Sequence, residues 1–165
     1  MVKNLMDRID KILNHDLFLY HLGRNNAAEA DRRFCRHSMV HFLDVARIGT
    51  IIALEEGLKI DREWIYAAAL LHDCGKHEQY ENGTPHEQAS ARIAPEILKA
   101  CGFDDEETAV IVTAISRHRD PEAAREKNLN GILYRADKAS RACFACDAKK
   151  DCNWKDGKKN LTIKY

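Results

Sequence analysis

The chain is poor in proline, glycine and aromatic residues, and it carries no net charge. Of its 165 residues, three are proline and eight are glycine, and aromatic residues make up 7%. Charged residues reach 32%. No strand-like alternation of useful length appears, so this profile favours an all-helical fold. The length suits one compact domain with a core of its own.

The balanced charge and the lack of long apolar runs exclude several classes of protein. Lys plus Arg number 26 and Asp plus Glu also number 26, which gives no support to binding of nucleic acid or a membrane surface. No apolar run approaches the ~20 residues that span a bilayer. The first twenty residues carry charges throughout and indicate a helix, not a signal peptide. Six cysteines without a secretory signal favour a reducing, cytoplasmic compartment, where thiols bind metal more often than they form disulfides.

Apolar residues at helical spacing divide the chain into predicted helices. We expect helices at about 2–20, 36–57 and 61–76, and a polar loop with a short helix at 22–33. Asp61 is a candidate N-cap. Capping boxes are predicted at 84–87, with a proline at the first helical position, and at 104–107. Pro95 should kink or interrupt its helix, and a last core helix should follow Asn130-Gly131.

A histidine and an aspartate, His72 and Asp73, stand side by side after an apolar run. Ile65, Ala68 and Ala69 lie seven, four and three positions before His72, which therefore continues the buried stripe of a helix. Burying an imidazole and a carboxylate is costly unless something pairs with them. A divalent metal accepts both, although a buried hydrogen-bonded pair would also explain the dipeptide.

Four further residues extend this pattern. His41, His118 and Asp137 lie on apolar helical faces, and His86 lies in a first helical turn, whose partial positive charge favours neutral imidazole. His37, one turn before His41, competes with it. Hydrogen bonds could satisfy each residue alone, but not all of them in one small core. Six ligands exceed the needs of one catalytic ion, so we expect two ions that share a carboxylate: His41, His72, Asp73, His86, His118 and Asp137.

The order of these residues resembles that of the HD-domain phosphohydrolase superfamily. The residues around the ligands also resemble the motifs of this family at His72-Asp73-x-Gly75-Lys76 and in the stretch that ends at Asp137. The two extra histidines are similar to the binuclear branch, which includes bacterial hydrolases of symmetrical dinucleoside tetraphosphates and the HD-GYP phosphodiesterases. The first resemblance is the closer, because the GYP signature is missing. It implies one helical HD domain at 1–142, and we expect the remaining residues, 143–165, to form a cysteine-containing tail that packs on this domain.

The resemblance also implies which residues hold the two ions. His41, His72, Asp73 and Asp137 would hold the first ion; His86, His118 and the other oxygen of Asp73 would hold the second. His37 has no counterpart as a ligand. Iron or manganese suits such ligands, with zinc, cobalt or nickel as alternatives. Two ions would lower the pKa of a bridging water so that it attacks phosphorus.

The implied substrate is a small phosphorylated molecule, with a nucleotide as the favoured class. Asp73 would act in catalysis as the bridge, and Lys76 and Arg141, one turn beyond His72 and Asp137, could neutralise the substrate. Ordinary solvated charges are the alternative for both cations. Two other functions stay open: a di-iron oxygenase of HD fold, and a sensory or interaction domain that keeps its metal for structure.

The C-terminal segment carries a second cysteine pattern outside the HD resemblance. Cys143, Cys146 and Cys152 form C-x2-C-x5-C in a lysine-rich stretch with little apolar material. Such a tail needs a staple to be well ordered. Cys35 is the best fourth ligand for a structural site, with zinc preferred over an iron–sulfur cluster and with free thiols as the simplest alternative. Cys74 and Cys101 are expected to be core residues.

Overall fold

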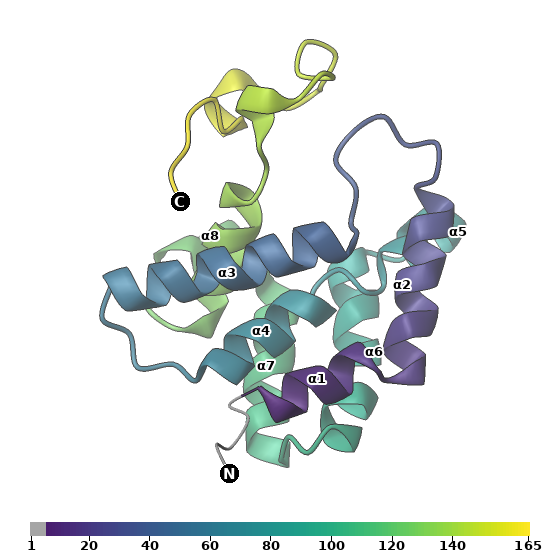
Figure 1. Ribbon diagram of the computed structural model, residues 1–165, viewed down its shortest axis with the longest axis vertical. Coiled ribbons are helices and arrows are strands. Elements are labelled where there is room, and N and C mark those ends of the chain that lie inside the picture. Colours follow the sequence, from purple (N-terminus) through teal and green to yellow (C-terminus); the bar gives the residue numbers. More distant parts are fainter. Residues whose placement is uncertain (1–5) are drawn as a thin grey trace.

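The computed structural model describes residues 6–165, which form an all-α structure without β-strands in that range. Its centre is built from α3 (Met39–Glu55), α4 (Arg62–Leu71), α7 (Asp105–Arg117) and α8 (Leu129–Ala139). Helix α3 packs between α4 and α8, and α7 packs against both α4 and α8 (Figure 1). The predicted helical fold is therefore confirmed. Within residues 6–165 no helix has the length and apolarity to cross a membrane.

Smaller helices cover the remaining sides of this centre. Helix α6 (His86–Ala100) packs on α7, and α5 (Lys76–Asn82) packs between α2 (Asp16–Ala28) and α6. Helix α1 (Asp7–Leu13) contacts α4. The segment after α8 stands apart from the bundle in Figure 1 and contains only two short 3-10 helices, Cys143–Ala145 and Asp156–Lys158.

The N-terminal prediction of one helix at 2–20, followed by a loop with a short helix at 22–33, is wrong. Two helices, α1 and α2, meet at Asn14-His15, where the His15 ring accepts the amide hydrogen of Leu17 at 3.2 Å and caps α2. Helix α2 then continues to Ala28. Its polar residues suggested a loop, but His21 and Asn25 point inward. Residues 2–5 of the predicted helix lie outside the described part of the chain.

The predicted helix at 61–76 is also divided. Asp61 caps it as expected, but α4 ends at Leu71 and α5 begins only at Lys76. The turn between them lets α6 approach closely, because a Cβ on Gly75 would lie 2.7 Å from the Cβ of Ala89. Such a distance excludes any side chain at Gly75. The division frees His72 and Asp73 from a regular helix.

The remaining helix boundaries differ in smaller ways. The predicted capping box at 84–87 is absent, because the Thr84 hydroxyl donates to Asn82 instead, and Pro85 takes the N-cap position. Pro95 lies inside an uninterrupted α6. The capping box at Asp104 is confirmed. Helix α3 starts at 39 instead of 36, and α8 starts at 129, before the Asn-Gly pair.

Candidate metal centre

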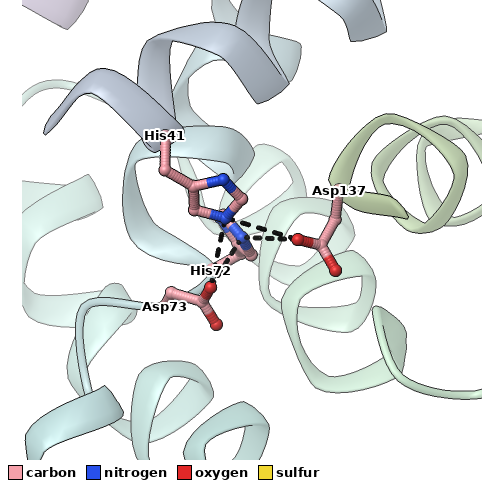
Figure 2. A group of neighbouring side chains, drawn as sticks. All are labelled: His41, His72, Asp73 and Asp137. Carbon is pink, nitrogen blue, oxygen red and sulfur yellow. Dashed lines mark ion pairs between the residues drawn. The ribbon is translucent and has the colours of Figure 1, made fainter. Parts of the chain in front are cut away.

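The turn after α4 brings four of the six predicted ligands together. His41 enters from the first turn of α3 and Asp137 from α8, facing His72 and Asp73 (Figure 2). The His41 Nε2 atom lies 3.4 Å from Asp73 Oδ2 and 3.3 Å from Asp137 Oδ1. The His72 Nε2 atom lies 3.1 Å and 3.7 Å from the same two oxygens. These four ligand atoms all lie within 4.8 Å of one another.

A second group lies on the other side of Asp73. His86 is the first residue of α6, and His118 directly follows α7. Their Nε2 atoms lie 3.2 Å and 3.4 Å from Asp73 Oδ1. Asp73 thus presents one oxygen to each group. The structure brings all six predicted side chains into two adjoining sets that share this carboxylate.

Hydrogen bonds at Nδ1 fix the orientation of all four rings. A carbonyl oxygen can only accept, so Nδ1 of His72 donates to Ala69 at 2.6 Å and Nδ1 of His118 donates to Ile115 at 2.7 Å. Nδ1 of His86 lies 2.6 Å from Gln79 Oε1. Ser140 gives its hydroxyl hydrogen to the carbonyl of Asp137, so its oxygen accepts from Nδ1 of His41 at 3.2 Å.

In its neutral form, with the hydrogen on Nδ1, each ring would turn a bare Nε2 lone pair into the centre. The Nε2 atoms of His86 and His118 are 3.2 Å apart, although neither carries a hydrogen in this tautomer. Nε2 of His72 and Oδ1 of Asp73 are buried without a hydrogen-bond partner. Converging lone pairs and carboxylates repel one another unless a cation lies between them. The donor set therefore fits divalent metal ions.

The charges of the centre also call for a cation. Burial lowers the pKa of His72, but the carboxylates of Asp73 and Asp137 outweigh it and raise this pKa to about 10. Burial opposes ionisation of Asp73, yet its histidine neighbours hold its pKa well below the usual range. Against burial, hydrogen bonds from His41 and His72 likewise hold the pKa of Asp137 well below its usual range, so both carboxylates are ionised. A proton on His72 offsets part of this negative charge, and a divalent ion in its place would supply more positive charge.

The second group favours neutral imidazole. Burial, opposed by Asp73 but reinforced by Lys76, lowers the pKa of His86 to about 3. The ring is therefore neutral at physiological pH and available as a metal ligand. Its neighbour Gln79, which sequence reasoning missed, accepts the Nδ1 hydrogen and orients the ring.

Sequence reasoning also missed a buried carboxylate beside the centre. Glu29 accepts from Nδ1 of His37 at 2.5 Å and from the Tyr80 hydroxyl at 2.6 Å. Burial opposes its ionisation, but these donors lower the pKa of Glu29 to about 2. His37 lies outside both groups of candidate ligands, with its Nε2 atom 3.8 Å from Asp73 Oδ2. The polar stretch that holds Glu29 gave no periodic signal that could have revealed this pair.

The two predicted cations lie at opposite sides of the centre. The Nζ atom of Lys76 is 3.2 Å from Nδ1 of His86 and 3.2 Å from Gln79 Oε1. Arg141 lies beyond the end of α8, where Nη1 donates to the carbonyl of Arg36 and Nη2 lies 3.3 Å from Nε2 of His41. Lys76 therefore adjoins the second group, and Arg141 adjoins the first.

The cysteines divide as the sequence suggested. Cys74 and Cys101 are buried in the core. The other four line a single cavity beside His41: Cys35, Cys143, Cys146 and Cys152.

Comparison with known proteins agrees with this geometry. The family model described as HD domain matches residues 39–142, which include all six candidate ligands. The chain belongs to the HD-domain family. This HD-domain chain is also 49% identical over 160 residues to a protein of Clostridium beijerinckii (strain ATCC 51743 / NCIMB 8052) described as uncharacterized, which covers 97% of the chain and 100% of the relative. No solved structure matches.

Proposed function

We propose that this HD-domain chain is a metal-dependent phosphohydrolase that cleaves a phosphoester or phosphoanhydride bond. The observation that carries the proposal is the sharing of Asp73 between two buried groups of ligands. Two ions that share a carboxylate would suit phosphoryl transfer, in which both the attacking and the leaving oxygen need stabilisation. When bound, the ions would supply Lewis acidity and an acidified water.

Positive side chains beside the second group support an anionic substrate. Burial lowers the pKa of the Lys76 ammonium, against the attraction of Asp73, and this side chain lies next to His86. Arg119 is also close enough to lower the pKa of His86. Lys76 donates one hydrogen to Gln79 Oε1, and when Nδ1 of His86 also donates to Gln79, the other hydrogens of Lys76 stay available for a phosphate oxygen. A nucleotide is our proposed substrate class.

The buried pair Glu29–His37 gives the site a proton carrier. Glu29 accepts the Nδ1 hydrogen of His37 and so holds Nε2 toward Asp73. The backbone amide of His37 also donates to Glu29, at 2.6 Å, which fixes both residues in one orientation. An imidazole held in this way can accept a proton from an attacking group or return one to a leaving oxygen.

The test is a substrate screen on protein purified without oxygen and analysed for metal. Phosphomonoesters, cyclic and linear dinucleotides and nucleoside polyphosphates are each assayed for phosphate release or bond cleavage. We expect turnover that disappears with a chelator and returns with manganese or iron(II). Oxygen consumption with a small organic substrate would instead favour a di-iron oxygenase. Metal-loaded protein without either activity would favour a sensory domain, and both results would contradict the proposal.

A further inference from the structure

Four thiols from two distant segments meet at one cavity beside the histidine centre. The cavity has a volume of about 350 Å³ and is lined by Cys35 and by the tail cysteines Cys143, Cys146 and Cys152. All four are free thiols. The Cys35 thiol lies close enough to interact electrostatically with each of the other three. None of these residues takes part in the proposed hydrolysis.

Contacts on both sides hold the two segments in this position. Arg33, two residues before Cys35, forms an ion pair with Asp151 at 2.5 Å, next to Cys152. Asn160 donates to the carbonyls of Lys138 at 2.8 Å and Arg141 at 2.9 Å, which joins the tail to the end of α8. The convergence of the cysteines is therefore part of how the tail docks.

The tail has almost no core that could hold it in place. Between 143 and 165, the buried residues are Cys143, Ala148 and Asn160. So little buried apolar surface cannot offset the conformational entropy of an ordered segment of this length. A bound group that ties the thiols together would supply the missing stabilisation.

The spacing of the sulfur atoms distinguishes between two such groups. In a tetrahedral zinc site, with Zn–S bonds near 2.3 Å, the sulfurs lie about 3.8 Å from one another. Two sets of three or more ligand atoms within 4.8 Å of one another occur among the described residues, and both are the histidine–carboxylate groups. No three cysteine sulfurs of these residues form such a set. An iron–sulfur core places iron and sulfide between its thiolates and so holds them further apart.

The charge around the cavity suits a group with several thiolates. Asp44 is the one carboxylate among the described residues that line it. Five cationic side chains line it as well: Arg33, Arg36, Arg141, Lys149 and Lys159. Cations and hydrogen-bond donors near the sulfurs stabilise thiolates and the net negative charge of a four-thiolate cluster. Charge alone would also suit zinc, so the choice between the two groups rests on the spacing of the sulfur atoms.

We propose that Cys35, Cys143, Cys146 and Cys152 bind an iron–sulfur cluster of the [4Fe–4S] type. The cluster pins the tail to the segment before α3 and is separate from the two ions of the histidine centre. The sequence pattern alone favoured zinc, but we prefer the cluster because no three of the described cysteine sulfurs lie within 4.8 Å of one another. Because Arg141 lines the cavity and contacts His41, the cluster also fixes the side of the histidine centre that faces the tail.

The test is to measure acid-labile sulfide, iron and zinc in protein purified without oxygen, or reconstituted with iron(II) and sulfide. Sulfide is the deciding quantity, because the histidine centre can bind iron but needs no sulfide. We expect about four sulfides per chain, and after reduction an electron paramagnetic resonance signal of a cluster. Cys146→Ser and Cys152→Ser should lose the sulfide and keep the histidine-bound metal. Cys101→Ser, at a buried thiol away from the cavity, is the matched control and should keep both.

Two results would overturn the proposal. The first is one zinc per chain that is released when the four thiols are alkylated, with no sulfide. The second is wild-type protein that takes up no sulfide on reconstitution and leaves four freely titrating thiols. If a serine variant fails to fold, circular dichroism will show it. The sulfide content and resonance signal of the wild-type protein then decide the question without any variant.

Discussion

The histidine centre and the cysteine cavity differ in what holds their ligands. His41, His72 and Asp137 extend from helices, or from the turn at a helix end, whose apolar faces form the core. The cysteines lie in the segment before α3 and in a tail with little buried surface. Packing therefore places the first set of ligands before any ion binds, whereas the second set depends on the group it binds. Nearby sites in one chain can thus differ in whether metal is needed for their shape.

The two regions also meet, at the end of α8. Ser140 accepts a hydrogen bond from His41, and the next residue, Arg141, contacts His41 and lines the cavity together with it. Asn160 of the tail holds the carbonyl of Arg141. A change in the tail can therefore reach His41 through these contacts, but it has no such route to His86 on the far side of Asp73.

The strongest way to test the contrast is to remove the shared carboxylate with Asp73→Ala. Because each group loses an oxygen, and the four histidines lose the negative charge between them, we expect both ions and all measurable turnover to disappear. The cluster in the tail should stay, because Asp73 does not line the cysteine cavity. Metal and sulfide analysis of the purified variant, with circular dichroism to check the fold, measures each expectation.

Single-group variants serve as controls for Asp73→Ala. His86→Ala and His118→Ala should reduce the histidine-bound metal from two ions to one, and Asp137→Ala should do the same from the other group. Asp105→Asn, at an exposed aspartate, should keep both ions. If Asp73→Ala protein retained two ions, the assignment of a shared bridge would be wrong.

The sequence was sufficient to group the candidate ligands because burial and helical spacing are linked. His41 and His118 continue apolar stripes, so the pattern that places the core also places these rings. The position of Asp73 does not follow from helical spacing in this way. Its role requires the turn that ends α4, and the close approach at Gly75 that explains this turn depends on a helix distant in the sequence.

The groups that orient the ligands and the neighbouring His37 could not be predicted in the same way. Gln79, Ser140 and Glu29 act through hydrogen bonds between separate elements, and polar residues carry no periodic signal for such contacts. Asn25 is a residue for which this missing signal led to a wrong prediction. Its buried amide donates to the carbonyl of Asp73 and accepts from the amide of His77, yet its polarity suggested a loop.

A smaller expected effect separates catalysis from metal binding within the histidine centre. Lys76→Ala removes the ammonium beside His86 but leaves Gln79 to orient that ring. Losing a charged contact made in the transition state lowers turnover by roughly a hundredfold. We expect this loss with both ions retained, and partial recovery in Lys76→Arg. Steady-state kinetics and metal analysis measure it. Unchanged kinetics on the true substrate would show that Lys76 is an ordinary solvated charge without a role in catalysis.

The smallest expected effect on turnover comes from the tail itself, through Asn160→Ala. The side-chain amide of Asn160 donates to the carbonyls of Lys138 and Arg141, and the residue is buried. Each lost hydrogen bond costs about 1 kcal/mol, so we expect opening of the tail to rise on the order of tenfold to thirtyfold. Limited proteolysis of residues 143–165 measures it when opening is fast compared with cleavage. Asn153→Ala, at an exposed position of the same tail, is the matched control.

Because Arg141 loses only its backbone anchor, turnover should change by a few-fold at most and the histidine-bound metal should stay. Cleavage of Asn160→Ala at the wild-type rate would show that these two side-chain hydrogen bonds do not hold the tail, and loss of the histidine-bound metal would show that the two regions are not separable.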